Sequence, residues 1–233
     1  INMKNNNPKG ILLILIGMFI VSFMDATFKY INTSVNLYEA YFVRTLVSFV
    51  VIASYLKITN KPIIFTTHYP LLTSIRVILF FFGFSSFYIS LTIMPLATAT
   101  ALFFASPFLM TIFAIFFLKE EVGIRRWSAV IIGFIGVYII LNPDFNDFDY
   151  LSLTPVLCAF CYALSMIIIK KTSDKDDVYS QMFHFYIFAI TISLIIYFFI
   201  GDGQYNNFDY PASQFILRKW FSNLEFSLPY MIF

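Results

Sequence analysis

The chain contains a long uncharged stretch, Val77 to Leu118, which is interrupted near its middle only by Met94-Pro95. A helix of about 20 apolar residues crosses the roughly 30 Å hydrocarbon layer of a bilayer. The stretch is therefore long enough for two such helices joined by a turn at the proline, and it predicts a transmembrane hairpin. Similar uncharged blocks recur along the chain, which predicts an all-α polytopic membrane helix bundle.

The composition supports the membrane class and narrows the expected chemistry. Hydrophobic residues make up 60% of the chain and charged residues 12%, whereas soluble domains have about 45–50% and about 25%. Cys158 and Cys161 are too few for a disulfide framework. The sequence shows no metal-ligand cluster, phosphate-binding glycine loop, nucleophile–base spacing or basic–aromatic patch. We therefore expect no cofactor, no metal, no nucleic-acid partner and no enzymatic activity.

Seven complete spans are expected, and an eighth begins near Phe226. Its apolar run to Phe233 is too short to cross a bilayer, which predicts a fragment lacking its last helices. The seven spans cover residues 10–31, 38–56, 74–93, 96–118, 127–141, 151–169 and 178–200.

Lysine and arginine gather in alternate connections between these spans. Such a bias marks the cytoplasmic side of a membrane protein, so we expect the N-terminus and the basic connections to be cytoplasmic. Arg218 and Lys219, in an irregular connection 201–224, are the main exception. The basic residues are Lys4, Lys9, Lys57, Lys61, Arg76, Lys119, Arg125, Arg126, Lys170, Lys171 and Lys175.

One segment, from Met94 to Asn142, carries a family resemblance: MPLATATALFFASPFLMTIFAIFFLKEEVGIRRWSAVIIGFIGVYIILN. It resembles the EamA-type transporters of the drug/metabolite transporter superfamily. The motifs around Asp25 and Arg44 are also similar to that family. The resemblance implies a ten-helix plan of two five-helix repeats, with residues 10–141 as the first and 151–233 as an incomplete second. Five spans per repeat would make the second repeat inverted. The resemblance also implies solutes such as amino acids, drugs, S-adenosylmethionine or riboflavin.

Two charged residues fall at membrane depth in the first two spans. Asp25 lies about six residues before the outer end of the first span, and Arg44 about six residues after the start of the second, so both are roughly 9 Å below the surface. Ionisable residues at such depth are costly, tend to pair and mark pathways. One hypothesis is that Arg44, with Lys29, binds an anionic part of a substrate while Asp25 serves as counter-ion or proton site. The alternatives are a structural ion pair and snorkelling of the two cations to the surface.

Further polar residues are candidates for contact with a substrate, each beside a structural alternative. Pro107 interrupts the fourth span, where it either kinks the helix for packing or forms a hinge with Ser106. His184 is a candidate proton relay or a satisfied interior histidine. The complete set of predicted substrate-binding residues is Asp25, Lys29, Arg44, Tyr88, Ser106, Pro107, Tyr162 and His184.

Small residues in two of the spans are typical of close helix packing. Gly83, Ser86 and Ser90 share the third span, and Cys158 and Cys161 lie in the sixth. We expect these stripes to form helix interfaces, with the two thiols behaving as small apolar groups.

The favoured function is a secondary transporter that moves a small organic metabolite by alternating access, driven by the solute gradient, exchange or protons. The alternative is a membrane-embedded enzyme acting on a lipid or polyprenyl substrate. The expected partners are the solute and the lipid bilayer, and a homodimer stays open. The expected location is the bacterial inner (plasma) membrane.

Removing the charges at membrane depth tests the transport hypothesis. We expect Arg44→Ala and Asp25→Asn each to abolish solute uptake without lowering expression, because each removes a charge from the pathway. Uptake assays with quantified membrane expression check this, and unchanged uptake in both variants would contradict it.

Overall fold

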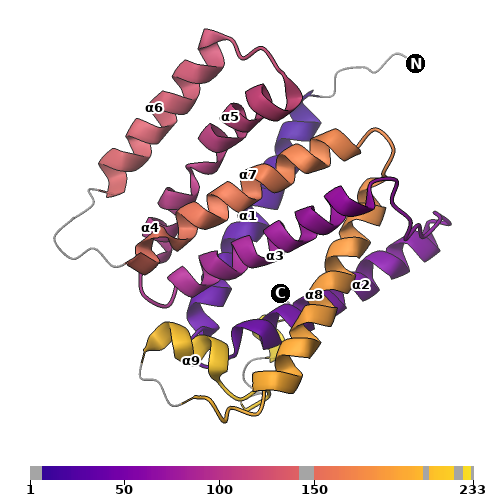
Figure 1. Cartoon of the computed structure of the whole chain (residues 1–233), viewed down its shortest axis with the longest axis vertical. Helices are drawn as coiled ribbons and strands as arrows, with labels where there is room; N and C mark the ends of the chain where they lie inside the picture. Colours follow the sequence, from indigo (N-terminus) through magenta and orange to yellow (C-terminus); the bar gives the residue numbers. More distant parts are fainter. Residues whose placement is uncertain (1–6, 142–149, 207–209, 223–227, 232–233) are drawn as a thin grey trace.

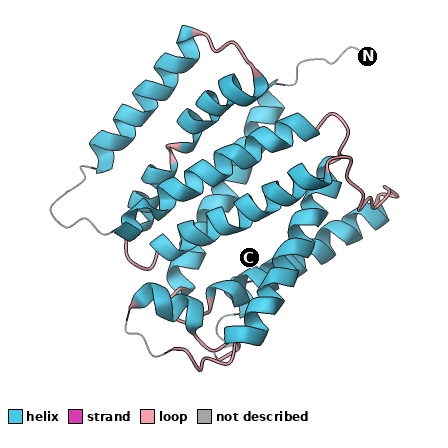
Figure 2. Cartoon of the chain, viewed as in Figure 1, coloured by secondary structure: helices cyan, strands magenta, loops and turns pink. Residues whose placement is uncertain are grey.

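A computed structural model describes residues 7–141, 150–206, 210–222 and 228–231, and the account below is confined to them. In this part of the chain all regular structure is helical, with no strand (Figures 1 and 2). The elements are α1 (Asn7–Ile31), α2 (Leu37–Ile58), α3 (Pro70–Ser90), α4 (Leu96–Phe103), α5 (Ser106–Leu118), α6 (Ile124–Leu141), the 3-10 helix η1 (Tyr150–Leu153), α7 (Thr154–Thr172), α8 (Val178–Ile200) and α9 (Pro211–Leu217).

Six segments of the described chain are long and apolar enough to cross a membrane, and together they confirm a polytopic helical membrane protein. One of them, Leu96–Leu118, consists of α4 and α5 in series. The fifth expected span forms α6, in which the apolar portion Trp127–Gly136 is shorter, so the total of seven stays a prediction. The acidic connection 142–149 and the start of an eighth span at Phe226 lie outside the described residues.

The helices run up and down between two ends of the bundle. We call the end that carries connections 59–69, 119–123 and 173–177 the basic end, and the end that carries 32–36, 91–95 and 201–210 the opposite end. Side-chain caps fix where two helices begin. Asn36 accepts a hydrogen bond of 2.9 Å from the backbone N–H of Tyr38 at the start of α2, and Asp177 accepts one of 3.1 Å from Tyr179 at the start of α8. Such caps satisfy donors that the first turn leaves free.

The fourth expected span is broken, as its internal proline predicts. α4 ends at Phe103 and α5 begins at Ser106, with Phe104 and Ala105 between them. Pro107 has no N–H to donate to the Phe103 carbonyl, so the helical ladder cannot continue through this point.

α3 packs along α7, and α2 packs along α8 (Figure 1). The α3–α7 contact is close because Gly83 faces Cys161: a Cβ atom at Gly83 would lie only 2.7 Å from the Cys161 Cβ. Cys158 is fully buried in the same interface. The small-residue stripes of the third and sixth spans therefore pack against each other, which confirms the predicted interface.

The connection 201–224 was expected to be irregular, but it contains α9 and is tied to the turn between α1 and α2. Arg218 donates to the carbonyls of Asn32 and Val35, at 3.3 Å each. Asn36 in turn donates to the Arg218 carbonyl at 2.8 Å. Arg218, an exception to the charge pattern, thus has a structural role. Its guanidinium donates hydrogen bonds to backbone carbonyls in the turn between α1 and α2.

The α3–α7 contact predicts that Gly83→Ala destabilises the protein. We expect a loss of about 1–3 kcal/mol, because the added methyl group overpacks the interface against Cys161. Thermal unfolding in detergent measures the effect. Cys161→Gly removes the opposing Cβ, so the double variant should lose less stability than the sum of the single variants. If the losses of stability in the two single variants simply add in the double variant, the contact between Gly83 and Cys161 does not limit the packing of α3 on α7.

Candidate functional site

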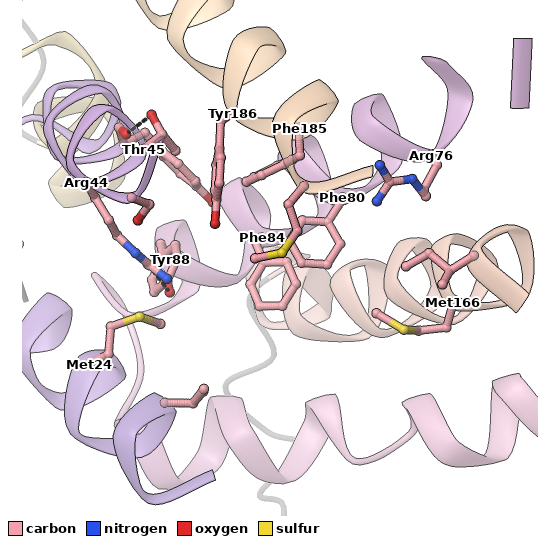
Figure 3. Close-up of a pocket in the computed structure, with 15 residues that line it drawn as sticks. Met24, Arg44, Thr45, Arg76, Phe80, Phe84, Tyr88, Met166, Phe185 and Tyr186 are labelled. Atoms are coloured by element: carbon pink, nitrogen blue, oxygen red, sulfur yellow. Dashed lines mark hydrogen bonds between the residues drawn. The ribbon is translucent and has the colours of Figure 1, made fainter. Parts of the chain in front are cut away.

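A cavity of about 410 Å³ lies among five helices, α1, α2, α3, α7 and α8 (Figure 3). Its walls are mostly apolar and aromatic with a few polar groups, which is typical of small-molecule sites of this size. The lining residues are Val21, Met24, Tyr41, Arg44, Thr45, Ser48, Arg76, Phe80, Phe84, Tyr88, Met166, Ile169, Met182, Phe185 and Tyr186.

One end of the cavity is formed by Arg44 and Tyr88. The Tyr88 hydroxyl donates to the Asp25 carboxylate at 3.2 Å and accepts from Arg44 Nη1 at 3.4 Å. Phe28 stacks on the Tyr88 ring with centroids 4.2 Å apart, and the Arg44 guanidinium carbon lies 5.7 Å from the Phe28 centroid. The hydroxyl, held by this stacking, links the two charged groups.

The structural ion pair expected between Asp25 and Arg44 does not form directly. Among the described residues, no ion pair joins these two side chains, and Tyr88 stands between them. Tyr88 is 2% exposed, so the carboxylate and the guanidinium meet through a buried phenol. Asp25 supports the cavity wall from behind, while Arg44 and Tyr88 line the cavity itself.

Arg76 forms the far end of the same cavity, opposite Arg44 (Figure 3). The expected span 74–93 contains Arg76, but the charge bias grouped it with the neighbouring basic connection; in the structure it lies well inside α3, which begins at Pro70. Its side chain is 6% exposed, and Nη2 donates to the Gln181 carbonyl at 2.6 Å. This candidate was missed because Arg76 was counted among the basic residues that mark the cytoplasmic side.

A pattern in α3 could have revealed this face. Arg76, Phe80, Phe84 and Tyr88 recur at every fourth residue and all line the cavity. Side chains four apart lie on one side of a helix. The stripe therefore connects the two ends of the cavity along one helix.

Three other predicted residues lie away from the cavity lining. Lys29 donates to the carbonyls of Leu91 and Met94, the latter at 3.1 Å, and so supports the connection between α3 and α4. Ser106 is buried and Pro107 is exposed at the α4–α5 break. Their roles as substrate contacts stay predictions.

Tyr162 and His184 occupy two further environments. The Tyr162 ring packs behind the cavity wall, 5.3 Å from the Phe103 centroid. His184 lies beside a second hollow of about 420 Å³ between α3 and α8. Its Nδ1 is 2.7 Å from the Ser180 carbonyl, so that nitrogen carries the proton. This bond satisfies the ring within its own helix, and a proton-relay role stays a prediction.

A polar network closes the basic end around Asp176, which is 4% exposed. Its carboxylate accepts from the Thr67 hydroxyl, from the His68 backbone N–H at 2.8 Å and from His68 Nδ1 at 3.1 Å. Ser180 also donates to the Thr66 carbonyl at 3.0 Å. Burial alone would raise the pKa of Asp176, but the hydrogen bonds from His68 and Thr67 outweigh it and hold that pKa below its ordinary value.

The fold and cavity define a class, an integral membrane helix bundle with a cavity among its helices. The family model described as the EamA-like transporter family matches residues 8–142. The chain belongs to this family, which confirms the resemblance and favours transport over enzymatic activity.

Three kinds of bacterial transporter are similar to the chain. The S-adenosylmethionine uptake transporter of Rickettsia prowazekii is 33% identical over 79% of this chain and 63% of its own length. The riboflavin transporter of Vibrio cholerae is 35% identical over 44% of this chain and 34% of its own length. The pseudopaline exporter of Pseudomonas aeruginosa is 22% identical over 91% of this chain and 70% of its own length. The chain thus spans less than two thirds of the Rickettsia relative, and no solved structure matches it.

The Asp176 network predicts an acid-sensitive contribution to stability. Because the folded-state pKa lies below the unfolded value of about 3.9, the contribution is present above that pH and is lost as pH falls through the folded-state pKa. We expect Asp176→Asn to lower stability at pH 7 by about 1–3 kcal/mol, and the difference from wild type to shrink on acidification.

Thermal unfolding of the detergent-solubilised protein between pH 3 and pH 7 measures this effect. Asp174→Asn is the matched control, since Asp174 is exposed and accepts from the Tyr69 hydroxyl at 3.2 Å. Its effect should be smaller. Equal effects of the two variants would contradict a special role for Asp176.

Proposed function

We propose that the protein is a secondary transporter that moves a small organic metabolite through the Arg44–Arg76 cavity by alternating access. The observation that carries the proposal is a cavity with a guanidinium at each end and aromatic walls, inside a bundle of the EamA-like family. Ionisable side chains at membrane depth tend to mark transport pathways.

S-adenosylmethionine is the first candidate solute, because the Rickettsia relative is named for its uptake. Its carboxylate suits a guanidinium, which binds it with two parallel hydrogen bonds. Its adenine suits stacking on aromatic side chains, and its sulfonium suits the negative face of such rings. Phe80, Phe84, Phe185 and Tyr186 supply those faces between the two arginines (Figure 3).

The same framework supports a proposal for the transport cycle. Segments far apart in sequence are tied at the opposite end through Asn36 and Arg218, and at the basic end through Asp176. Alternating access would release one network while the other holds. The α4–α5 break at Phe104 and Ala105 would serve as a hinge, since Pro107 cannot donate the helical hydrogen bond to the Phe103 carbonyl.

Topology follows the sequence expectations as part of this proposal. Residues 10–141 form the first five-helix repeat and residues 151–233 an incomplete second one, in inverted orientation. The N-terminus and the basic end face the cytoplasm, in line with the charge bias. The membrane is the bacterial inner membrane, since the named relatives come from bacteria.

Uptake of labelled S-adenosylmethionine by cells that express the protein tests the function. We expect saturable uptake in which the solute is recovered chemically unchanged. Tyr88→Phe should lower uptake at least about tenfold, because it removes the hydroxyl that positions Arg44. Tyr138→Phe on the exposed face of α6 is the matched control and should match wild type. Conversion of the solute to a product would support an enzyme instead, and no uptake would exclude this solute.

A further inference from the structure

Arg76 is a buried cation that faces the cavity without an acidic partner. It lies six residues into α3, or roughly 9 Å from the start of the helix. Its recorded partner is the neutral carbonyl of Gln181, although a guanidinium has five N–H donors. Within the described parts of the chain, no carboxylate lies at ion-pair distance from it. A buried charge without compensation is unfavourable.

The nearest acidic group is occupied by other donors. Asp176 attracts Arg76 electrostatically, but its two oxygens accept from Thr67 and His68. The carboxylate is thereby committed to the network that closes the basic end. Arg76 is left with donors that an incoming anion can use.

Arg44 differs from Arg76 in this respect. It reaches the Asp25 carboxylate through the Tyr88 hydroxyl and lies over the Phe28 ring. An acid and an aromatic face already compensate its charge. Both ends of the cavity thus carry a guanidinium, but only the guanidinium of Arg44 is linked to an acidic group.

We infer that Arg76 is the anion-binding residue of the cavity and that the solute carries a carboxylate at that end. This inference rests on the proposed transport function and names the part of the solute that each end accepts. The planar guanidinium binds a carboxylate with two parallel hydrogen bonds. The carboxylate of the solute would supply the negative charge that Arg76 lacks among its neighbours in the protein.

The rest of the solute extends toward Arg44 along the aromatic stripe. Phe80 and Phe84 follow Arg76 at one and two helical turns, and Tyr186 lies on the facing helix (Figure 3). Twelve residues of helix separate Arg76 from Tyr88, a distance of about 18 Å along the axis. The expected class is a ring-bearing solute with a carboxylate at the end of a short chain.

A pair of probes that differ only in the carboxylate tests this inference. Equilibrium binding of S-adenosylmethionine and of its decarboxylated form is measured on the purified protein in detergent. We expect wild type to bind the carboxylated probe with an affinity at least about tenfold higher, which corresponds to the free energy of one charge-assisted hydrogen bond. Arg76→Gln should erase that preference while still binding the decarboxylated probe about as wild type does.

Matched variants separate this role from a structural one. Arg125→Gln, on the exposed start of α6, should keep the wild-type preference. Arg76→Lys keeps the charge without the planar fork, so its preference should fall between wild type and Arg76→Gln. This variant decides the matter if Arg76→Gln fails to fold, since an unchanged preference in Arg76→Lys would overturn the inference.

Two further outcomes have distinct meanings. If Arg44→Gln erases the preference and Arg76→Gln retains it, the carboxylate binds at the other end and the inference is wrong. If wild type binds neither probe, the proposed solute fails first, and the assignment of the carboxylate to Arg76 falls with it.

Discussion

A guanidinium at membrane depth must find compensation inside the protein, because the hydrocarbon offers neither water nor counter-ions. Arg44 meets this requirement, whereas Arg76 meets it only in part. Arg44 is linked through Tyr88 to a carboxylate, whereas Arg76 has a backbone carbonyl. Both conditions depend on α3, which contributes Tyr88 at one end of the cavity and Arg76 at the other. The position of α3 therefore determines the electrostatics of the whole site.

Close packing on a neighbouring face holds α3 in that position. Gly83 lets α7 approach until a single added methyl group would collide with Cys161. α7 in turn brings Met166 and Ile169 to the cavity wall. Without a hydrophobic driving force between helices in lipid, such fit between small residues provides much of the association. The helix that carries Arg76 and Tyr88 is thus held in place by small apolar residues at its interface with α7.

The class of fold and part of the site could be predicted from the sequence, because both depend on short-range patterns. Hydropathy gives the helices, and the short turn between the first two spans places Asp25 and Arg44 at similar depth. Tyr88 as their bridge could not be predicted, since it lies 63 residues from Asp25 and reaches it only through tertiary packing. Lys29 was placed with Asp25 by helical spacing, yet its long side chain reaches the Leu91 carbonyl instead.

Arg76 was missed for a different reason, which concerns how its charge was interpreted. The expected span 74–93 contains Arg76, but the charge bias assigned it to the basic connection before that span. The helix in fact begins at Pro70, whose missing N–H and fixed φ suit the first turn. Counting from Pro70 places Arg76 in the second turn, on the stripe shared with Phe80 and Phe84. A charged residue at the edge of an apolar block is therefore worth testing against the helical period as well as the charge bias.

The two end networks differ in a way that bears on the proposed cycle. At the basic end, one carboxylate, Asp176, accepts from the Thr67 hydroxyl and from the backbone N–H and Nδ1 of His68, so losing its charge weakens those bonds together. At the opposite end, Asn36 and Arg218 donate separately to backbone carbonyls, which have no charge to lose. Loss of that one charge would therefore weaken the three Asp176 bonds together, whereas the bonds of the opposite end do not share a charged group. In the proposed alternating-access cycle, a charged solute would act on the basic end, since Arg76 lines the cavity and is attracted by Asp176.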